Sequence, residues 1–335
     1  MAESSKKRTL DAFFKPPPKK VKVSDAEGSS TKVQESELEE DVEYSNHLTY
    51  PFPIPHFKTS ITTHLSSLPS TGGKTVNDQP DLDLLYFQPY IPKYLERQIF
   101  DFLRSELPFY RVRYMIKRGG IESEVNTPRY TTVFGLDNTS RFSSDDSNQI
   151  LDVTTSQPIL KDKYYTKYPP RPLPKCLDDL RLSTEAATGC TFNFCLVNYY
   201  ASGADSISYH SDDEKFLGEL PAIASFSLGA KRDFLMKHKP VAPSDNAPPP
   251  PETKPIKLPL ASGDMILMKG KTQANWLHSI PKRTGKNAED GGRINITFRR
   301  AMARAGTENY YNYNVGTGIV YKWDGNAREM KPWKA

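Results

Sequence analysis

Short runs of apolar and β-branched residues recur along the chain, and Gly, Pro, Asp or Asn clusters separate them. The runs are rich in Val, Ile, Phe, Tyr and Thr, which favour β-strands. The pattern therefore predicts seven strands. These are Tyr110–Ile116, Tyr130–Phe134, Phe192–Tyr200, Ala222–Leu228, Asp233–Lys237, Asp264–Met268 and Ile294–Arg299.

Two further segments have the spacing of amphipathic helices. Pro92–Glu106 carries apolar residues at Leu95, Ile99, Phe102 and Leu103, one face of a helix, and Pro174–Thr188 shows a weaker version of this pattern. The order of elements favours a fold that is mainly antiparallel β with flanking helices. No internal repeat is visible.

Two polar segments interrupt this pattern and are predicted to be insertions. Residues 138–157 are rich in Ser and Asp, and residues 239–259 contain the run Pro248–Pro251. A proline run cannot join a sheet ladder, so we expect the second segment to be an extended, solvated loop.

Composition and charge divide the chain into three parts. Residues 1–23 carry seven Lys/Arg against two acidic residues, and residues 24–47 carry eight Asp/Glu against one Lys. Residues 1–47 have few apolar positions and are predicted to be a disordered tail. We expect one folded domain over residues 48–304. The aromatic-rich extension 305–335 is expected to pack on it.

Several classes of protein are excluded. No apolar run approaches the roughly 20 residues of a membrane helix, and the N-terminus is basic where a secretory signal is apolar. The three cysteines are too few for a disulfide framework, so a reducing compartment is expected.

The most informative cluster is His210-Ser211-Asp212, together with His278 further along the chain. Residues i and i+2 of a strand share a face, so His210 and Asp212 can reach one ion. A third ligand from His278 would complete a two-histidine, one-carboxylate set, which suits Fe(II) with open coordination positions. By itself, an H-x-D triplet is also compatible with a surface turn.

The run Arg293 to Arg299 supports the metal hypothesis. Arg293, Asn295, Thr297 and Arg299 alternate with apolar residues, as in a strand with one polar face inside a barrel. Buried arginines require an anion, and a dicarboxylate matches the guanidinium fork. The alternative is a basic strand that faces solvent.

With these residues in place, the sequence resembles the AlkB branch of Fe(II)/2-oxoglutarate dioxygenases over about residues 85–300, in a fungal-like nuclear form. R-x-N-x-T-F-R is the specific motif, and H-x-D-x-E is shared with DNA-repair members. The matching segments are Asn198-Tyr199-Tyr200, His210 to Glu214, Ser225-Phe226-Ser227-Leu228-Gly229, His278 and Arg293 to Arg299.

The resemblance implies a double-stranded β-helix, or jelly roll, with His210, Asp212 and His278 on iron. It further implies that Asn198 and Tyr200 bond 2-oxoglutarate, that Arg293 holds its far carboxylate, and that Arg299, with Asn295 and Thr297, holds the carboxylate beside the iron. The cofactors would be Fe(II), 2-oxoglutarate and O₂. The reaction would yield succinate, CO₂, formaldehyde and an unmodified base.

The same resemblance suggests substrate contacts. Asp213 and Glu214 would face a cationic methylated base, although either could instead orient a metal ligand. Arg129 matches a position near the substrate lid, and Tyr165 and Lys167 would line the base pocket. Arg232 would face phosphate or solvent. Ile121, beside a glycine turn, would enter the base stack or simply close an ordinary hairpin.

The basic tail contains two overlapping motifs. Lys6-Lys7-Arg8 and Lys19-Lys20-Val21-Lys22 have the spacing of a bipartite nuclear import signal. Leu10, Phe13 and Phe14 resemble the peptide that binds the sliding clamp PCNA, with Lys7 where that motif usually has Gln. Both motifs favour a nuclear protein that contacts an import receptor and the clamp.

We therefore expect a monomeric nuclear enzyme, without membrane contact, that demethylates 1-methyladenine and 3-methylcytosine in DNA. Two alternatives stay open. One is the same chemistry on RNA or protein, and the other is a non-catalytic nuclear adaptor on a degenerate jelly roll.

Overall fold

The structure is a computed structural model that describes residues 42–144, 149–159, 165, 169–212, 214–241, 252–283, 291–303 and 318–334. The predicted tail motifs, including Leu10, Phe13 and Phe14, lie outside these residues, as do Lys167 and Asp213. Among the described helices, none is both long and apolar enough to cross a membrane.

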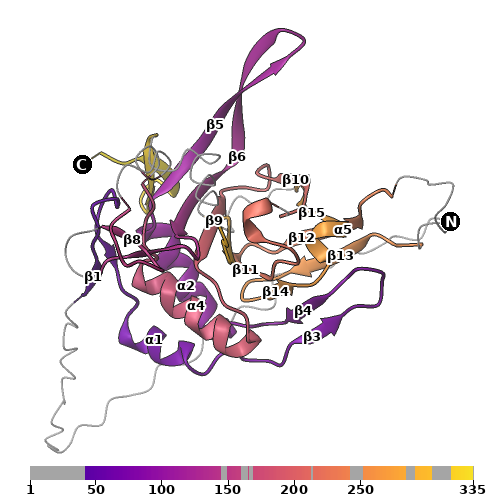
Figure 1. Ribbon diagram of the computed structural model, residues 1–335, viewed down its shortest axis with the longest axis horizontal. Coiled ribbons are helices and arrows are strands. Elements are labelled where there is room, and N and C mark those ends of the chain that lie inside the picture. The colour runs from indigo at the N-terminus through magenta and orange to yellow at the C-terminus, as the bar shows by residue number, and fades with distance from the viewer. Residues whose placement is uncertain are drawn as a thin grey trace, which may run out of the picture. The chain divides into compact units, whose positions relative to one another are not determined.

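Two antiparallel sheets dominate the described part of the chain (Figure 1). The larger has the order β18-β17-β5-β6-β9-β16-β11-β14-β4-β3, and the smaller has the order β10-β15-β12-β13. The strands of the larger sheet are β3 (Lys74–Val76), β4 (Leu84–Phe87), β5 (Phe109–Arg118), β6 (Ile121–Gly135), β9 (Phe194–Tyr200), β11 (Ile223–Gly229), β14 (Met265–Met268), β16 (Arg293–Arg299), β17 (Val320–Asp324) and β18 (Glu329–Pro332). Those of the smaller sheet are β10 (Ile207–His210), β12 (Arg232–His238), β13 (Ile256–Leu260) and β15 (Trp276–Ile280).

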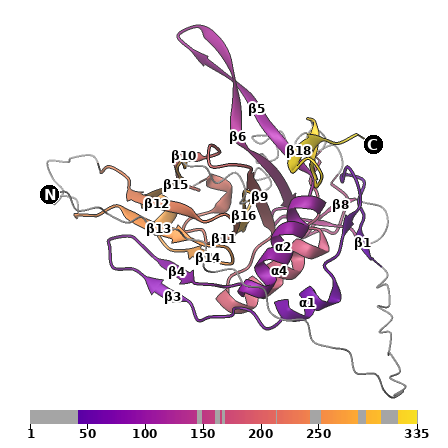
Figure 2. The same ribbon diagram turned by 180° about the vertical axis from the view of Figure 1, so that it is seen from behind.

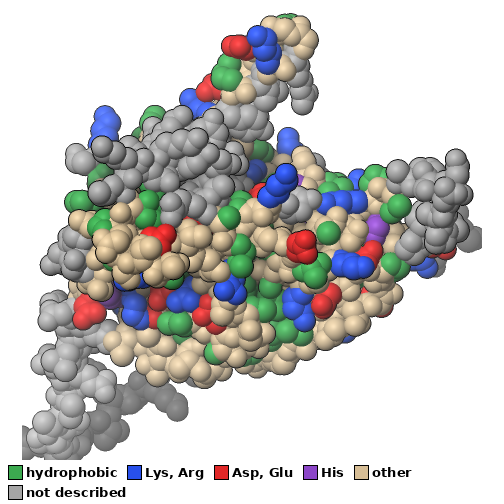
Figure 3. All heavy atoms as spheres, viewed as in Figure 1, with side chains coloured by type: hydrophobic (Ala, Val, Ile, Leu, Met, Phe, Trp, Pro, Cys, Tyr) green, Lys and Arg blue, Asp and Glu red, His purple; other side chains and the backbone are tan. Residues whose placement is uncertain are grey.

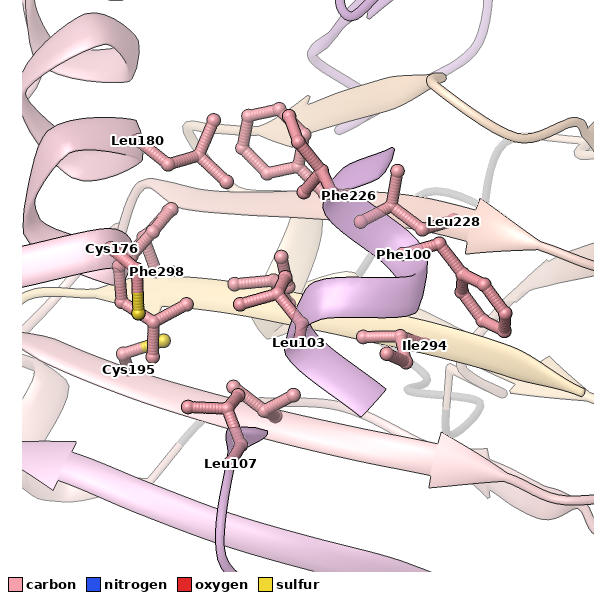
Figure 4. Close-up of a cluster of buried hydrophobic side chains, with 14 of the residues drawn as sticks. Phe100, Leu103, Leu107, Cys176, Leu180, Cys195, Phe226, Leu228, Ile294 and Phe298 are labelled. Carbon is pink, nitrogen blue, oxygen red and sulfur yellow. The ribbon is translucent and has the colours of Figure 1, made fainter. Parts of the chain in front are cut away.

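Helices cover one face of the larger sheet. They are α1 (Thr59–Leu65), α2 (Lys93–Glu106) and α4 (Lys175–Thr188), and the short α5 (Thr272–Asn275) and η1 (Lys215–Leu217) lie elsewhere. Figure 4 shows Phe100 and Leu103 of α2 and Leu180 of α4 packed over the sheet. Gly189 ends α4 with a φ of 67°, a left-handed conformation that glycine adopts without steric cost.

The central strand β16 shows why the sheet has two different faces. Ile294, Ile296 and Phe298 pack toward the helices, in the same cluster as Phe226 and Val197 of the neighbouring strands. The alternate residues of β16 therefore face the smaller sheet. A second apolar cluster lies on that side and joins Tyr200 and Ile266 to residues of the smaller sheet: Phe234, Met236, Trp276 and Ile280. Two facing antiparallel sheets with this core confirm the predicted jelly roll.

All seven predicted strands and both predicted helices are present, most with small shifts at their ends. The exception is the strand predicted over Tyr130–Phe134, because β6 already begins at Ile121. The prediction of a loop over residues 239–259 was wrong at its C-terminal side, because Ile256–Leu260 forms β13 and pairs with β12. The insertion at residues 138–157 contains a short ribbon of β7 (Ser140–Phe142) and β8 (Ile150–Asp152). Another ribbon joins β1 (Tyr44–Ser45) to β2 (Ile54–Pro55).

The β5–β6 hairpin extends well beyond the other strands of the larger sheet (Figures 1 and 2). Its turn is Gly119-Gly120, with φ values of 57° and 84°, and Arg118 pairs with Ile121 across it. Positive φ at both central residues defines the turn that matches strand twist in a two-residue hairpin. Charged side chains of both signs lie near the tip of the hairpin (Figure 3). Lys117 and Glu122 form one ion pair there, at 3.8 Å.

The C-terminal strands β17 and β18 extend the larger sheet beside β5. Trp323 lies over Arg104 of α2, with the guanidinium carbon 3.9 Å from the ring centroid. Tyr321 contacts Tyr130 edge to face at 5.2 Å. The aromatic residues described in this extension thus pack against the domain.

Candidate metal centre

The two predicted histidines meet where β10 and β15 pair. His210 ends β10 and lies opposite His278 of β15, with ring centroids 4.2 Å apart. Asp212 follows two residues later, and its carboxylate oxygens lie 3.7 Å from Nε2 of His210 and 4.0 Å from Nε2 of His278. One ligand atom from each residue lies within 4.8 Å of the others, so the predicted three-residue cluster is confirmed.

One detail of the prediction was wrong. Asp212 lies beyond the end of β10 rather than within an extended strand. The register of β10 against β15 brings the two histidines together, and the segment that follows β10 brings in the carboxylate.

The protonation states of His278 and Asp212, and the hydrogen bond of His210, suit a metal site. Burial lowers the pKa of His278 to about 3, so its imidazole is neutral at pH 7. Nδ1 of His210 lies 2.8 Å from the Ser208 carbonyl, and as a donor to it leaves the Nε2 lone pair for a metal. Burial by itself raises the pKa of Asp212, but Arg299 and the two histidines outweigh it and lower that pKa below its usual value.

A polar pocket adjoins the three residues. Its lining comes from both sheets: Arg129, Leu196, Asn198, Tyr200, Ile207, His210, Asp212, Ser225, Phe234, Met268, His278, Ile280, Arg293, Asn295, Thr297 and Arg299. The four polar residues of β16 all reach it, as their alternation predicts. Phe234 stacks on the His278 ring, at 5.3 Å between centroids, and forms an apolar wall.

Arg293 supplies a buried positive charge to this pocket. It is 1% exposed, its Nε donates to Ser227 Oγ at 2.9 Å, and Tyr200 lies beside the guanidinium. Burial lowers the pKa of Arg293 to about 10, which still leaves it charged at neutral pH. Within the described residues, its buried Nη1 has no hydrogen-bond partner. A carboxylate in the pocket would satisfy both the charge and this donor.

Asn198 is held in one orientation. Its Oδ1 accepts hydrogen bonds from Thr131 Oγ1 at 2.8 Å and from Arg129 Nε at 3.2 Å. Asn295 bonds instead to β11, through Ser225 Oγ at 2.9 Å and the Phe226 carbonyl at 2.7 Å. The amide nitrogen of Asn198 therefore points away from Thr131 and Arg129, whereas the amide nitrogen of Asn295 donates both of its hydrogen bonds to β11.

Arg299 pairs with the metal-ligand candidate itself. Its Nη2 lies 2.9 Å from Asp212 Oδ2, and its Nη1 lies 3.6 Å from Glu214 Oε1. The sequence predicted an inward-facing arginine, but the ion pair to Asp212 was not foreseen. Arg299 therefore orients the carboxylate and keeps it ionised.

The residues predicted to contact substrate are dispersed. Arg129 lines the pocket, and the partly buried Glu214 lies near its Arg299 wall. Ile121 is 73% exposed at the tip of the β5–β6 hairpin. Arg129 and Glu214 thus lie at the pocket, whereas Ile121 lies on the hairpin outside its lining.

Two of the predicted contacts do not fit the structure. Tyr165 is buried outside the pocket lining, where its hydroxyl lies 2.8 Å from both Asp137 Oδ2 and Ser140 Oγ. Arg232 is 4% exposed and donates to the carbonyls of Asp205 and Pro281, at 2.8 and 2.6 Å. Both side chains brace loops, and burial separates Arg232 from any phosphate.

Sequence reasoning gave no role to several residues of the site. Ser225 and Ser227 of β11 alternate with apolar residues and bond Asn295 and Arg293. Their period-two spacing is a usable signal, because hydroxyls on the inner face of a strand need partners. Thr131 bonds Asn198, and Gln273 bonds the backbone of Asp212. Both residues lie on other elements, and their spacing in the sequence carries no such signal.

The facing sheets, the His-Asp-His cluster and the buried arginines together define a 2-oxoglutarate-dependent, Fe(II)-binding oxygenase fold and site. The sequence profile of the 2OG-Fe(II) oxygenase superfamily matches residues 83–299, and the chain belongs to that family. The predicted class of Fe(II)/2-oxoglutarate oxygenase is thereby confirmed, with its cofactors Fe(II), 2-oxoglutarate and O₂.

Several other proteins are similar in sequence. "Alpha-ketoglutarate-dependent dioxygenase alkB homolog 3" of Rattus norvegicus is 38% identical over 163 residues, which is 44% of this chain and 52% of that protein. "DNA oxidative demethylase ALKBH2" of Homo sapiens is 39% identical over 133 residues, 40% of this chain and 49% of that protein. The Arabidopsis thaliana protein of the same name is 29% identical over 249 residues, 71% of this chain and 72% of its own length. The chain thus spans about half the length of the first two relatives.

Proposed function

We propose that this protein is an oxidative demethylase of N-alkylated bases in DNA, with 1-methyladenine and 3-methylcytosine as substrates. The observation that carries the proposal is the convergence of His210, Asp212 and His278 beside the buried Arg293 in one pocket. The names of the similar proteins, which include DNA oxidative demethylases, favour DNA over other polymers.

The side chains divide the work of such a reaction. His210, Asp212 and His278 would hold Fe(II), which when bound supplies the O₂ chemistry that couples oxidation of 2-oxoglutarate to hydroxylation of an N-methyl group. Arg293 would hold the far carboxylate of 2-oxoglutarate, with Tyr200 beside it. Asn198, fixed by Thr131 and Arg129, would donate its amide N–H to the same molecule.

The charge near the pocket suits a cationic base. Glu214 is partly exposed, and its carboxylate can accept hydrogen bonds from the amino group of a methylated adenine or cytosine. Arg129 forms part of the wall and would border the flipped nucleotide. Asp213, next to Glu214 in the chain, would add a second carboxylate.

The β5–β6 hairpin would contact the nucleic acid outside the pocket. Its tip combines the exposed Ile121 with Lys117, a cation paired loosely to Glu122 at 3.8 Å. An apolar side chain at such a tip can fill the gap that a flipped base leaves in a duplex.

The decisive experiment measures succinate and formaldehyde release on oligonucleotides that carry each methylated base. DNA in single-stranded and duplex form is compared with RNA of matched sequence and with a methylated peptide. We expect turnover on DNA, its loss in His210→Ala, and wild-type turnover in His64→Ala, which removes an exposed histidine of α1. Turnover confined to RNA or peptide would establish the alternative substrate. Absence of iron and of 2-oxoglutarate turnover would favour the adaptor.

For the tail, we propose nuclear import through the basic clusters and clamp binding through Leu10, Phe13 and Phe14. The spacing of these residues in the sequence supports the proposal. Replacement of Phe13 and Phe14 by Ala should abolish binding to immobilised PCNA without a change in demethylase turnover. Replacement of Lys19, Lys20 and Lys22 should shift a fluorescent fusion out of the nucleus. Retained clamp binding or retained nuclear signal would contradict the respective part.

A further inference from the structure

The backbone of Asp212 is held by a side chain that has no assigned role. Its N–H donates to Oε1 of Gln273 at 2.9 Å. Gln273 is 1% exposed, and its Nε2 contacts Met268 Sδ at 3.2 Å. Both ends of this amide are therefore engaged inside the protein, and neither end reaches solvent.

This bond matters because Asp212 lies outside the β10 strand. Sheet pairing fixes the backbone of His210 and His278, which lie opposite each other, but the ladder ends there. A buried N–H without a partner is costly, and a segment without ladder bonds has more freedom to move. Gln273 supplies the bond that the sheet does not.

The helix that carries Gln273 is itself anchored on several sides. Thr272 Oγ1 accepts a bond from Asp83 N at 2.9 Å, and Trp276 Nε1 donates to the Pro80 carbonyl at 3.0 Å. Lys239 N donates to the Asn275 carbonyl at 2.7 Å. These bonds surround a helix of four residues, so its position is set by residues 80–83, which precede β4, and by Lys239, which follows β12.

Gln273 also links two of the metal-ligand candidates. It precedes His278 by five residues on one continuous segment and bonds the backbone of Asp212 on another. Arg299 holds the carboxylate of Asp212 at its outer end, at 2.9 Å. Gln273 thus holds the backbone of Asp212, and Arg299 holds its carboxylate.

We propose that Gln273 is a positioning residue for the metal centre and that it holds Asp212 in the orientation that binds Fe(II). The proposal rests on the metal site of the proposed function but not on the identity of the substrate. Metal-ligand geometry depends on such supporting hydrogen bonds, and their loss typically weakens metal binding 10- to 100-fold.

The test measures Mn(II) affinity by electron paramagnetic resonance, in the presence of 2-oxoglutarate and without nucleic acid. Gln273→Met keeps the length of the side chain and removes the acceptor, and we expect Mn(II) to bind it at least tenfold more weakly. Gln273→Glu keeps an acceptor and should bind Mn(II) within about threefold of wild type. Asn275→Ala, in the same helix, should bind as wild type does.

Several results would overturn the proposal. One is wild-type Mn(II) affinity in Gln273→Met despite a lowered melting temperature, which would assign Gln273 a purely structural role. Another is equally weak binding in Gln273→Glu. Should Gln273→Met fail to fold, Gln273→Ala takes its place with the same expected loss. Because no substrate is present, failure of the demethylase assignment would leave these affinities unchanged, whereas wild-type protein that binds no Mn(II) would refute the metal site itself.

Discussion

Asp212 is the residue on which charge, metal binding and stability meet. Asp212 is 5% exposed, and its carboxylate lies 2.9 Å from the buried guanidinium of Arg299. Removal of one partner from a buried ion pair typically costs 3–5 kcal/mol, because the other charge is left without compensation. Asp212 thus contributes to the stability of the metal-free protein as well as to the metal site.

Asp212→Asn should abolish Mn(II) binding and destabilise the metal-free protein by about 3 kcal/mol at pH 7. The pKa of Asp212 is lower in the folded protein than its usual 3.8. A lowered carboxylate pKa gives stability that is present above the unfolded value and is lost as pH falls through the folded value. Urea unfolding from pH 7 to pH 3 should therefore show the difference between wild type and variant shrink below about pH 4. A difference that stays constant with pH would contradict this account.

Arg293 gives a second prediction at the scale of one residue. Arg293→Met should weaken 2-oxoglutarate binding about 100-fold, and Arg293→Lys should weaken it less, because an ammonium carries the charge without the bidentate fork. Titration calorimetry with Mn(II) present measures both. Since the pKa of Arg293 is about 10, wild-type affinity should also fall as pH rises through that value and the guanidinium loses its proton. Equal affinity in all three proteins would place the 2-oxoglutarate carboxylate elsewhere.

At the scale of elements, the proposed role of the β5–β6 hairpin can be tested by comparing duplex with single-stranded DNA. Ile121→Ala should reduce turnover on duplex DNA several-fold and leave single-stranded DNA unaffected, because only the duplex has a stack to fill. Leu182→Ala, which shortens an exposed apolar residue of α4, is the matched control and should change neither activity. An equal loss on both substrates would show that Ile121 is not a wedge.

Packing of the C-terminal strands yields another prediction. Trp323→Ala removes a partly buried ring that covers Arg104 at 3.9 Å and contacts Tyr199 edge to face at 6.2 Å. We expect a loss of about 2–4 kcal/mol in the free energy of unfolding, measured in urea, below the usual cost for a fully buried Trp. Tyr94→Ala, on the exposed side of α2, should cost much less. A negligible loss for Trp323→Ala would mean that β17 and β18 add little to the domain.

The elements also show how far sequence patterns reach. Strands β9, β11 and β16 were predicted because their alternation is long enough to read, and the polar face of β16 indicated the pocket. Strand β15 was not predicted, because five residues with three consecutive buried positions show no alternation. Its candidate ligand His278 was identified from its residue type, its place after Asp212 in the chain and the family resemblance.

Other residues could not be assigned from sequence because their roles depend on tertiary partners. Arg232 looks like an exposed cation in the sequence, yet carbonyls from two distant loops enclose it. Gln273 and Thr131 are ordinary polar residues until the fold brings them to Asp212 and Asn198. Periodicity identifies which face of an element is inside, whereas a hydrogen bond between distant segments leaves no local pattern.

At the scale of the whole molecule, the site joins segments from distant parts of the chain. Asn198 lies on β9, Asp212 follows β10, His278 is on β15 and Arg293 begins β16. Loss of any one strand from this arrangement removes a group from the pocket, so the site exists only in the folded domain. Ligands that bind the site should accordingly stabilise the whole fold by mass action.

The reactivity of the buried cysteines can measure how far ligands of the site stabilise the fold. Cys176 and Cys195 are fully buried between α4 and the larger sheet (Figure 4), and burial raises the pKa of Cys176 to about 12. Their thiols should resist iodoacetamide at pH 8 in the native protein, while the partly buried Cys190 reacts first. Mass spectrometry should show that alkylation of Cys176 and Cys195 follows global unfolding. Mn(II) alone at 100 times its dissociation constant should slow it by about 100-fold, since one bound ligand at that concentration lowers the unfolded fraction by that factor. If the ligand left the alkylation rates of Cys176 and Cys195 unchanged, these two thiols would become accessible through local openings that do not involve the metal centre.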